Sequence, residues 1–149
     1  MRVAITGSTG LIGSALTRSL LLDGHQVLRL TRGGTATAFS DGSESAAWDP
    51  KAGTVQPGAL EGAEAVVHLA GAGIGDKRWN DAYKKELRDS RVLSTQTIAR
   101  AVAELDVKPR VLISSSAVGY YGDTGDRVVE ESTPAGTDAR GARGGTGGR

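Results

Sequence analysis

Three glycines near the start of the chain have a spacing that suits the binding of a phosphate. The run TGSTGLIG places Gly7, Gly10 and Gly13 directly after the β-branched stretch Arg2–Thr6 and at the start of a segment with helical spacing. Gly7 permits a tight turn, Gly10 lets backbone approach a pyrophosphate, and Gly13 lets the helix lie close on the strand. The free N–H groups at the helix start attract anions. This strand–turn–helix context predicts a dinucleotide site; the alternative is a structural turn that binds nothing.

The end of the second predicted strand, Gln26–Thr31, indicates which dinucleotide. An NAD site usually carries an acidic residue about 20 residues after the glycines, where it holds the ribose 2′-hydroxyl. Here Thr31 and Arg32 occupy that place, and the next acid is Asp41. A guanidinium pairs with a 2′-phosphate, which a carboxylate would repel. The sequence therefore favours NADP over NAD, and the alternative is that Arg32 is only a solvated residue.

The elements that must position these residues alternate between strand and helix. Strands are predicted at Arg2–Thr6, Gln26–Thr31, Ser45–Trp48, Ala63–Ala70 and Arg110–Ser116. One helix follows the glycines with Ile12, Leu16 and Leu20 on its apolar face, and Gly24 is placed to end it. A long amphipathic helix over about 76–105 is predicted from the spacing of Trp79, Tyr83, Leu87, Ile98, Val102 and Leu105. This alternation predicts an α/β fold with a doubly wound parallel sheet.

The 149 residues are enough for one domain, predicted over residues 1–133. Residues 134–149 hold six Gly and three Arg and nothing that could form a core, so a disordered Gly/Arg-rich tail is predicted. The net charge is +1, but residues 1–133 alone carry 15 basic and 16 acidic residues. With this balance, residues 1–133 have no excess of positive charge of the kind that binds nucleic acid or an anionic membrane surface.

Composition also excludes several kinds of site. The chain has no cysteine and only two histidines, so neither a disulfide nor a metal site is expected. No signal peptide and no apolar run of membrane-spanning length are visible in the sequence. A cytoplasmic protein that does not enter a membrane is therefore expected.

Three motifs in a fixed order carry a family resemblance. With TGSTGLIG, HLAG (His68–Gly71) and ISSSAVGYYG (Ile113–Gly122), the chain resembles the N-terminal part of the extended short-chain dehydrogenase/reductases, in their NAD-dependent epimerase/dehydratase-like branch. It is most similar to the conserved epimerase-family proteins often labelled as nucleoside-diphosphate-sugar epimerases, which share WDP (Trp48–Pro50) and DKRW (Asp76–Trp79). The resemblance runs to about Asp138 and implies a Rossmann-like sheet of about five strands, with the later strands and substrate part missing.

The resemblance also implies roles for individual residues. The pyrophosphate contacts carried over are Gly7, Thr9, Gly10, Leu11, Ile12 and Gly13. The residues that would face the adenosine ribose are Thr31 and Arg32, and those that would line the cofactor are Leu69, Ala70 and Gly71. Ala72 stands where many relatives have Glu, and Arg91, four residues before Thr95, stands where the larger family has Asn.

For catalysis, the resemblance implies that Ser116 hydrogen-bonds a substrate oxygen, with Tyr121 lining the site. The alternative for Ser116 is a strand-end serine that bonds backbone. The superfamily's proton acceptor is a Tyr whose pKa is lowered by a Lys four residues later. That pair is absent here: the residues four positions after the three tyrosines are Leu87, Thr124 and Gly125.

Two functions follow as expectations. The first is an NADP-binding oxidoreductase or epimerase-like protein for a small carbonyl or nucleotide-sugar-type substrate, in a truncated form with little or no turnover. The second is a non-catalytic dinucleotide-binding or sensing module. A homodimer through the 77–105 helix is a further expectation from the resemblance.

Overall fold

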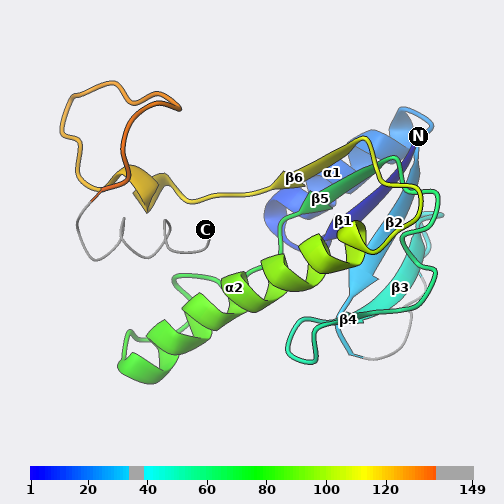
Figure 1. Ribbon diagram of the computed structural model, residues 1–149, viewed down its shortest axis with the longest axis horizontal. Helices are drawn as coiled ribbons and strands as arrows, with labels where there is room; N and C mark the ends of the chain where they lie inside the picture. The colour runs from blue at the N-terminus through cyan, green and yellow to red at the C-terminus, as the bar shows by residue number, and fades with distance from the viewer. Residues whose placement is uncertain (34–38, 137–149) are drawn as a thin grey trace. The chain divides into compact units, whose positions relative to one another are not determined.

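A computed structural model describes residues 1–33 and 39–136 (Figure 1). The chain divides into two units, Met1–Ser114 and Ser115–Arg149, and each is described by itself. The first unit contains the sheet and both α-helices of the described residues, and the second contains one short 3₁₀ helix.

The first unit alternates strands and helices along the chain. Its elements are β1 (Arg2–Thr6), α1 (Leu11–Leu22), β2 (Gln26–Thr31), β3 (Glu44–Asp49), β4 (Thr54–Val55), β5 (Ala65–His68), α2 (Asp81–Ala103) and β6 (Val111–Ser114). The strand order is β4-β3-β2-β1-β5-β6, and every neighbouring pair is parallel except β3 and β4. This confirms the predicted Rossmann-like parallel sheet. The sequence analysis missed β4, because two residues are too few to show a strand pattern.

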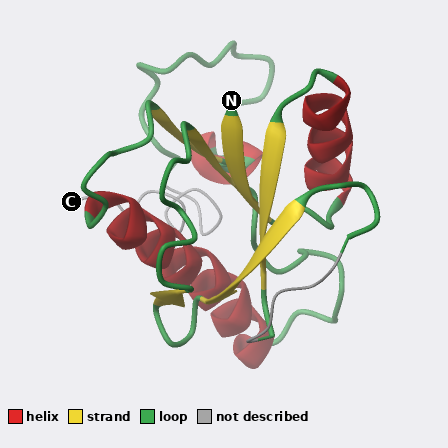
Figure 2. Ribbon diagram, turned by 90° about the vertical axis from the view of Figure 1, so that its right-hand side faces the viewer, coloured by secondary structure: helices red, strands yellow, loops and turns green. Residues whose placement is uncertain are grey.

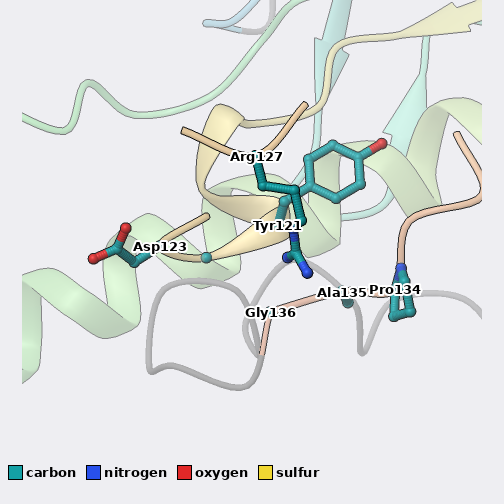
Figure 3. Close-up of a pocket in the computed structure, with 7 residues that line it drawn as sticks. Tyr121, Asp123, Arg127, Pro134, Ala135 and Gly136 are labelled. Atoms are coloured by element: carbon teal, nitrogen blue, oxygen red, sulfur yellow. The ribbon is translucent and has the colours of Figure 1, made fainter. Parts of the chain in front are cut away.

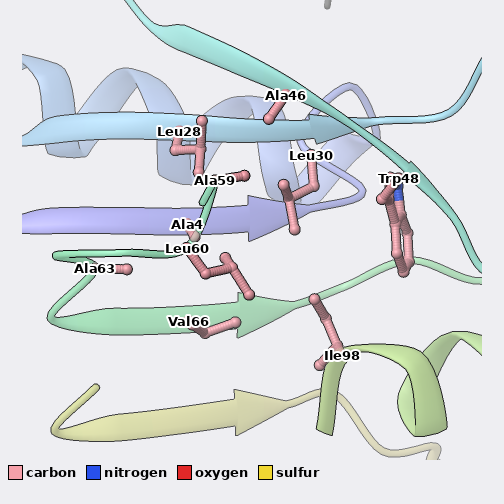
Figure 4. Close-up of a cluster of buried hydrophobic side chains, with 10 residues drawn as sticks. All are labelled: Ala4, Leu28, Leu30, Ala46, Trp48, Ala59, Leu60, Ala63, Val66 and Ile98. Atoms are coloured by element: carbon pink, nitrogen blue, oxygen red, sulfur yellow. The ribbon is translucent and has the colours of Figure 1, made fainter. Parts of the chain in front are cut away.

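Alternating side chains of the strands build one core on each face of the sheet. On one face, Leu16, Leu20 and Leu21 of α1 pack against Val3, Ile5, Val27, Ala65 and Val67. The cluster on the other face is formed by Ala4, Leu28, Leu30, Ala46, Trp48, Ala59, Leu60, Ala63, Val66 and Ile98, the last of these from α2 (Figure 4). Figure 2 shows the two helices on opposite sides of the strands, as the doubly wound prediction requires.

The first turn of α1 differs from the predicted apolar stripe. Leu16 and Leu20 pack on the sheet as expected, but Ile12 is 67% exposed and Leu11 is 90% exposed. The expectation for Ile12 was wrong because this turn stands beyond β1, where no strand side chain covers it. Two apolar side chains are therefore displayed beside the glycine-rich turn.

The second helix is shorter than the sequence predicted. The Asn80 side chain accepts a hydrogen bond from the backbone N–H of Tyr83 at 2.8 Å, and this N-cap starts α2 at Asp81. Trp79 consequently precedes the helix and is 49% exposed, whereas Tyr83 and Ile98 are buried as predicted. No helix in the described residues is both long and apolar enough to cross a membrane.

β6 forms one edge of the sheet, and its apolar side chains are open to solvent. Val111, Leu112 and Ile113 are 44%, 39% and 51% exposed. A central strand of a doubly wound sheet would bury these residues under a helix or a further strand. Within the described residues, β6 is therefore an open edge of the sheet.

The second unit contains η1 (Val118–Tyr121), the short 3₁₀ helix. The Tyr120 carbonyl accepts a hydrogen bond from the N–H of Gly136 at 2.9 Å, so the end of the described segment returns to η1. The predicted tail, residues 134–149, lies outside the described residues from 137 onward.

Substitution of Gly13 tests how closely α1 approaches the turn that precedes it. A Cβ at Gly13 would lie 2.2 Å from the Gly7 carbonyl oxygen, whereas one at Gly10 would lie 3.4 Å from the same atom. Gly13→Ala should therefore lower the free energy of unfolding by about 1–3 kcal/mol in urea denaturation. Gly10→Ala, the matched control in the same turn, should cost less. Equal stabilities of the two variants would contradict this packing.

Candidate functional site

The glycine-rich turn lies against the segment that follows β5. Gly7 has a φ of +70°, and a Cβ there would lie 2.8 Å from the Leu69 carbonyl carbon and 2.9 Å from the Ala70 nitrogen. The turn is closed by the Gly10 N–H, which donates to the Gly7 carbonyl at 3.1 Å. Only glycine combines this positive φ with such a close backbone contact. Two of the predicted site segments, 7–13 and 69–71, are therefore side by side.

The helix that begins at this turn leaves its first N–H groups open. Gly10 is the N-cap and offers no side chain to accept from them, and no acidic residue stands in the first turn. The first N–H bonded along the helix is that of Ser14, which donates to the Gly10 carbonyl at 2.9 Å. Free N–H groups and the positive end of the helix dipole bind anions. Thr9 is exposed beside them.

This turn stands where the strand order of the sheet reverses. β1 pairs with β2 on one side and with β5 on the other, and Thr6 aligns with Leu30 and with His68. In open parallel sheets, the crevice beyond the carboxyl ends of the strands at such a point is where ligands bind. The predicted residues thus converge on the position that the fold favours for a ligand.

A buried hydrogen-bond network holds the ends of β1 and β5 together. The Thr6 hydroxyl oxygen accepts from the backbone N–H groups of Leu69 and Ala70 at 3.2 and 3.3 Å. Because this oxygen already accepts from two N–H groups, we infer that its proton goes to His68 Nδ1, 2.7 Å away. Thr6 thereby fixes the backbone that touches Gly7.

The same network determines the state of His68. With Nδ1 accepting, the ring carries its proton on Nε2, which lies 3.2 Å from Ser94 Oγ and 3.3 Å from Thr95 Oγ1, both on α2. Trp48 packs edge-on against the ring at 6.1 Å between centroids. His68 is only 3% exposed, and this burial lowers the pKa of its imidazole below the ordinary value of 6.5. His68 is therefore a buried neutral link between β1, β5 and α2.

The end of β2 carries the other predicted contact, at the adenosine position. Arg32 is exposed, and the Thr31 hydroxyl donates to the Ala46 carbonyl at 3.4 Å. Asp41, the nearest downstream acid, is paired with Arg29 and accepts from the Ser43 hydroxyl at 2.6 Å. The hydrogen bonds from the Ser43 hydroxyl and from its backbone N–H, together with the charge of Arg29, hold the pKa of Asp41 below its usual value.

This pairing was missed from the sequence, although an arginine inside an apolar strand was its signal. Arg29 is only 8% exposed and donates from Nε to Ser43 Oγ at 2.8 Å, while its guanidinium stacks 4.1 Å from the centre of the Phe39 ring. A buried guanidinium needs such partners. Arg29 thereby joins residues 39–43 to β2. Residues 34–38, which connect the two in the sequence, lie outside the described part.

A model of the NAD dependent epimerase/dehydratase family matches residues 3–141, which is most of the chain. The chain belongs to this family.

Individual members of the family resemble the chain over nearly its whole length. An epimerase family protein of Mycobacterium tuberculosis is 49% identical over 135 residues, which cover 91% of this chain and 42% of that protein. The crystal structure of human epimerase family protein SDR39U1 (isoform 2) with NADPH is 30% identical, with a TM-score of 0.77, and covers 95% of this chain and 45% of that one. The crystal structure of a nucleoside-diphosphate sugar epimerase from Corynebacterium glutamicum is 39% identical, with a TM-score of 0.74. The match covers 97% of this chain and 28% of that one. The chain spans less than half the length of these relatives.

Within this epimerase/dehydratase-family chain, Ser116 and Tyr121 belong to the second unit. Ser116 is exposed, and its role as a substrate contact stays a prediction. A hollow of about 340 Å³ in this unit is lined by Tyr121, Gly122, Asp123, Arg127, Pro134, Ala135 and Gly136 (Figure 3). None of the predicted cofactor residues lies in it, so we place the functional site at the glycine-rich turn instead.

The buried state of His68 predicts how stability depends on pH. Because folding lowers the pKa of His68, the unfolded chain binds a proton below about pH 6.5 that the folded chain does not. The free energy of unfolding contributed by the neutral His68 is therefore fully present above that pH. It is lost as the pH falls toward the pKa that His68 has in the folded chain. In urea denaturation between about pH 7.5 and 5.5, wild type should lose more stability than His68→Gln. Parallel pH profiles of the two proteins would contradict the buried neutral histidine.

Proposed function

We propose that this chain binds a nicotinamide dinucleotide, NADP in preference to NAD, across the carboxyl ends of β1 and β5. The observation that carries the proposal is the contact between Gly7 and the Leu69–Ala70 backbone beside the open N-terminus of α1. The nucleotide would serve an oxidoreductase or epimerase reaction on a small carbonyl or nucleotide-sugar-type substrate.

The phosphate end of the proposed site is built from backbone. The N–H groups of Leu11, Ile12 and Gly13 would donate to the pyrophosphate, and Thr9 would add its hydroxyl. The absence of a Cβ at Gly10 leaves room for this approach. Leu69, Ala70 and Gly71 would line the adjoining part of the cofactor, because Thr6 holds their backbone against the turn.

The adenosine end supports NADP for two reasons. Arg32 directly follows β2 and is exposed, so its guanidinium is available to a 2′-phosphate beside Thr31. Asp41, the acid that could have taken the ribose hydroxyl instead, is engaged by Arg29 and Ser43. The human relative SDR39U1, whose crystal structure contains NADPH, points the same way.

The chemistry of the proposed reaction divides between the cofactor and the chain. A bound nicotinamide accepts or donates a hydride. The chain would hold the dinucleotide, and Ser116 would hydrogen-bond the substrate oxygen that gains or loses a proton. None of the three tyrosines in residues 1–149 is followed by a lysine four residues later.

A second candidate function is a non-catalytic dinucleotide-binding or sensing module. It draws on the same observation, because the described residues that meet at the glycine-rich turn are ones that would bind a nucleotide. The substrate class rests on the name of the Corynebacterium glutamicum relative, a nucleoside-diphosphate sugar epimerase. A carbonyl-reduction assay with NADPH separates the two candidates, because only the first predicts turnover.

The cofactor preference can be tested with Arg32→Ala. Loss of a charge-assisted pair with the 2′-phosphate should weaken NADPH binding about ten-fold or more and leave NADH binding unchanged. Fluorescence titration of the reduced nucleotides measures both affinities. Arg18→Ala, which removes an exposed arginine from the middle of α1, is the matched control and should change neither. An NADPH-to-NADH preference that survives Arg32→Ala would refute this assignment, and no binding of either nucleotide by wild type would refute the site.

A further inference from the structure

One hydroxyl group holds the peptide that would line the cofactor. The N–H of Ala70 donates to Thr6 Oγ1 at 3.3 Å and to no other acceptor in the described residues. The N–H of Leu69 donates to the same oxygen and to the Thr6 carbonyl, both at 3.2 Å. Because Gly7 lies against the Leu69–Ala70 peptide, the fit of the glycine-rich turn depends on what Thr6 Oγ1 can accept.

The ring of His68 decides how much this oxygen can accept. Its Nδ1 lies 2.7 Å from Thr6 Oγ1, and a neutral ring that accepts the hydroxyl proton leaves the oxygen free for the two N–H groups. A protonated ring would donate from Nδ1 to the same oxygen instead. Three donors would then compete for two lone pairs, and the hydroxyl proton would have lost its acceptor. The N–H of Ala70 has no second acceptor, so it is the group that would be left unpaired.

The groups that face the His68 ring are uncharged. Nε2 lies 3.2 and 3.3 Å from the hydroxyl oxygens of Ser94 and Thr95 on α2, and Trp48 of β3 packs edge-on at 6.1 Å between centroids. The residues aligned with His68 in the sheet are a threonine on β1 and Ser114 on β6. The ring is only 3% exposed, so water does not reach it freely either.

The charged side chains of the same elements are bonded elsewhere. Asp49 of β3 accepts from two backbone N–H groups of the turn that follows it. On α2, the Arg91 guanidinium donates to two backbone carbonyls, and Arg2, at the other end of β1, pairs with Glu44. A proton on His68 would therefore be a buried charge without a counter-ion, and this burial lowers the pKa of the ring.

We propose that His68 is a positioning residue of the nucleotide site, and that the site binds a dinucleotide tightly only while this ring is neutral. An unpaired Ala70 N–H would release the peptide after β5 from Gly7, and Leu69, Ala70 and Gly71 would no longer line the cofactor. His68 itself touches no ligand. The inference rests on the proposed function for its ligand, and it adds that affinity is coupled to the ionisation of a buried group. Such coupling is reciprocal, so a bound nucleotide must lower the pKa of His68 further.

The first experiment measures the affinity for NADP of wild type and His68→Asn by titration calorimetry as a function of pH. Asn presents an amide oxygen at the position of Nδ1, so it keeps an acceptor for the Thr6 hydroxyl that does not titrate. The wild-type Kd should rise relative to that of His68→Asn by up to about ten-fold for each pH unit below the pKa of His68 in the nucleotide-free chain. The 2′-phosphate itself titrates near about pH 6, but it does so for both proteins and cancels in this ratio.

His68→Gln is the matched control for the geometry. Its longer amide reaches the position of Nε2, so it keeps a partner for α2 and removes the acceptor for Thr6. At neutral pH it should bind NADP about five-fold or more weakly than His68→Asn. Circular dichroism at each pH verifies that the proteins stay folded.

The second experiment uses wild type alone and therefore does not depend on the folding of any variant. The chain has two histidines, and His25 lies beside the amine of Met1, at the other end of the sheet. In NMR titrations, saturating NADP should lower the pKa of His68 by the amount that the pH dependence of the affinity requires. The ring signals of His25 are the internal control.

The outcomes separate this inference from the proposed function. If the affinities of wild type and His68→Asn keep a constant ratio as pH falls, and His68 titrates alike with and without NADP, the inference is overturned and the dinucleotide site stands. A loss of affinity that only follows the loss of folded protein overturns it as well. If wild type binds no nucleotide at neutral pH, the proposed function fails, and the inference fails with it.

Discussion

The structure depends on one close backbone contact, between Gly7 and the Leu69–Ala70 peptide. A side chain at Gly7 would overlap this peptide, and its φ of +70° already disfavours any other residue. The contact joins the turn after β1 to the end of β5, on the side of β1 where the strand order reverses. Because α1 starts from this turn, the direction of its open N-terminus is set by the same contact. A loose turn here would leave the sheet intact and would displace the N–H groups of the proposed phosphate site.

Hydrogen bonds of the buried Thr6 and His68 side chains hold this contact in place. No sequence pattern predicts that these two side chains bond to each other. Thr6 uses its whole hydrogen-bonding capacity on Leu69, Ala70 and His68. His68 in turn is hydrogen-bonded to Ser94 and Thr95 of α2, so the network joins the sheet to this helix. A buried network of this kind is rigid only when every member is satisfied, which requires a neutral histidine with one defined tautomer. The histidine of HLAG is accordingly a structural residue, and the segment after it is the part that can meet a ligand.

Local patterns predicted the parts of the fold that local forces determine. The β-branched strands, the glycine spacing and the alternation of elements were enough for the parallel sheet and its two covered faces. The errors arose where tertiary contacts or caps decide: Asn80 shortens α2 and excludes Trp79, and the first turn of α1 exposes Ile12. β4 has only two residues, and its pairing with β3 comes from the turn between them.

Local sequence patterns also predicted the glycine-rich part of the candidate site, but not its side-chain pairings. Glycines that permit a close approach leave a signature in the sequence, so the turn and the segment 69–71 could be named. Pairings between distant side chains show at most one partner in the sequence. Arg29 stands out inside an apolar strand, but its partner Asp41 cannot be named until the chain is folded.

We propose that a dinucleotide lies across the carboxyl ends of β1 and β5, with its phosphates on the start of α1. Amide hydrogen exchange of the purified chain, measured with and without NADPH, reports on these residues directly. Exchange should slow at Leu11, Ile12 and Gly13 and at Ala70 and Gly71 when NADPH is added. Unchanged exchange at these amides, or protection confined to the segment after Ser114, would contradict it.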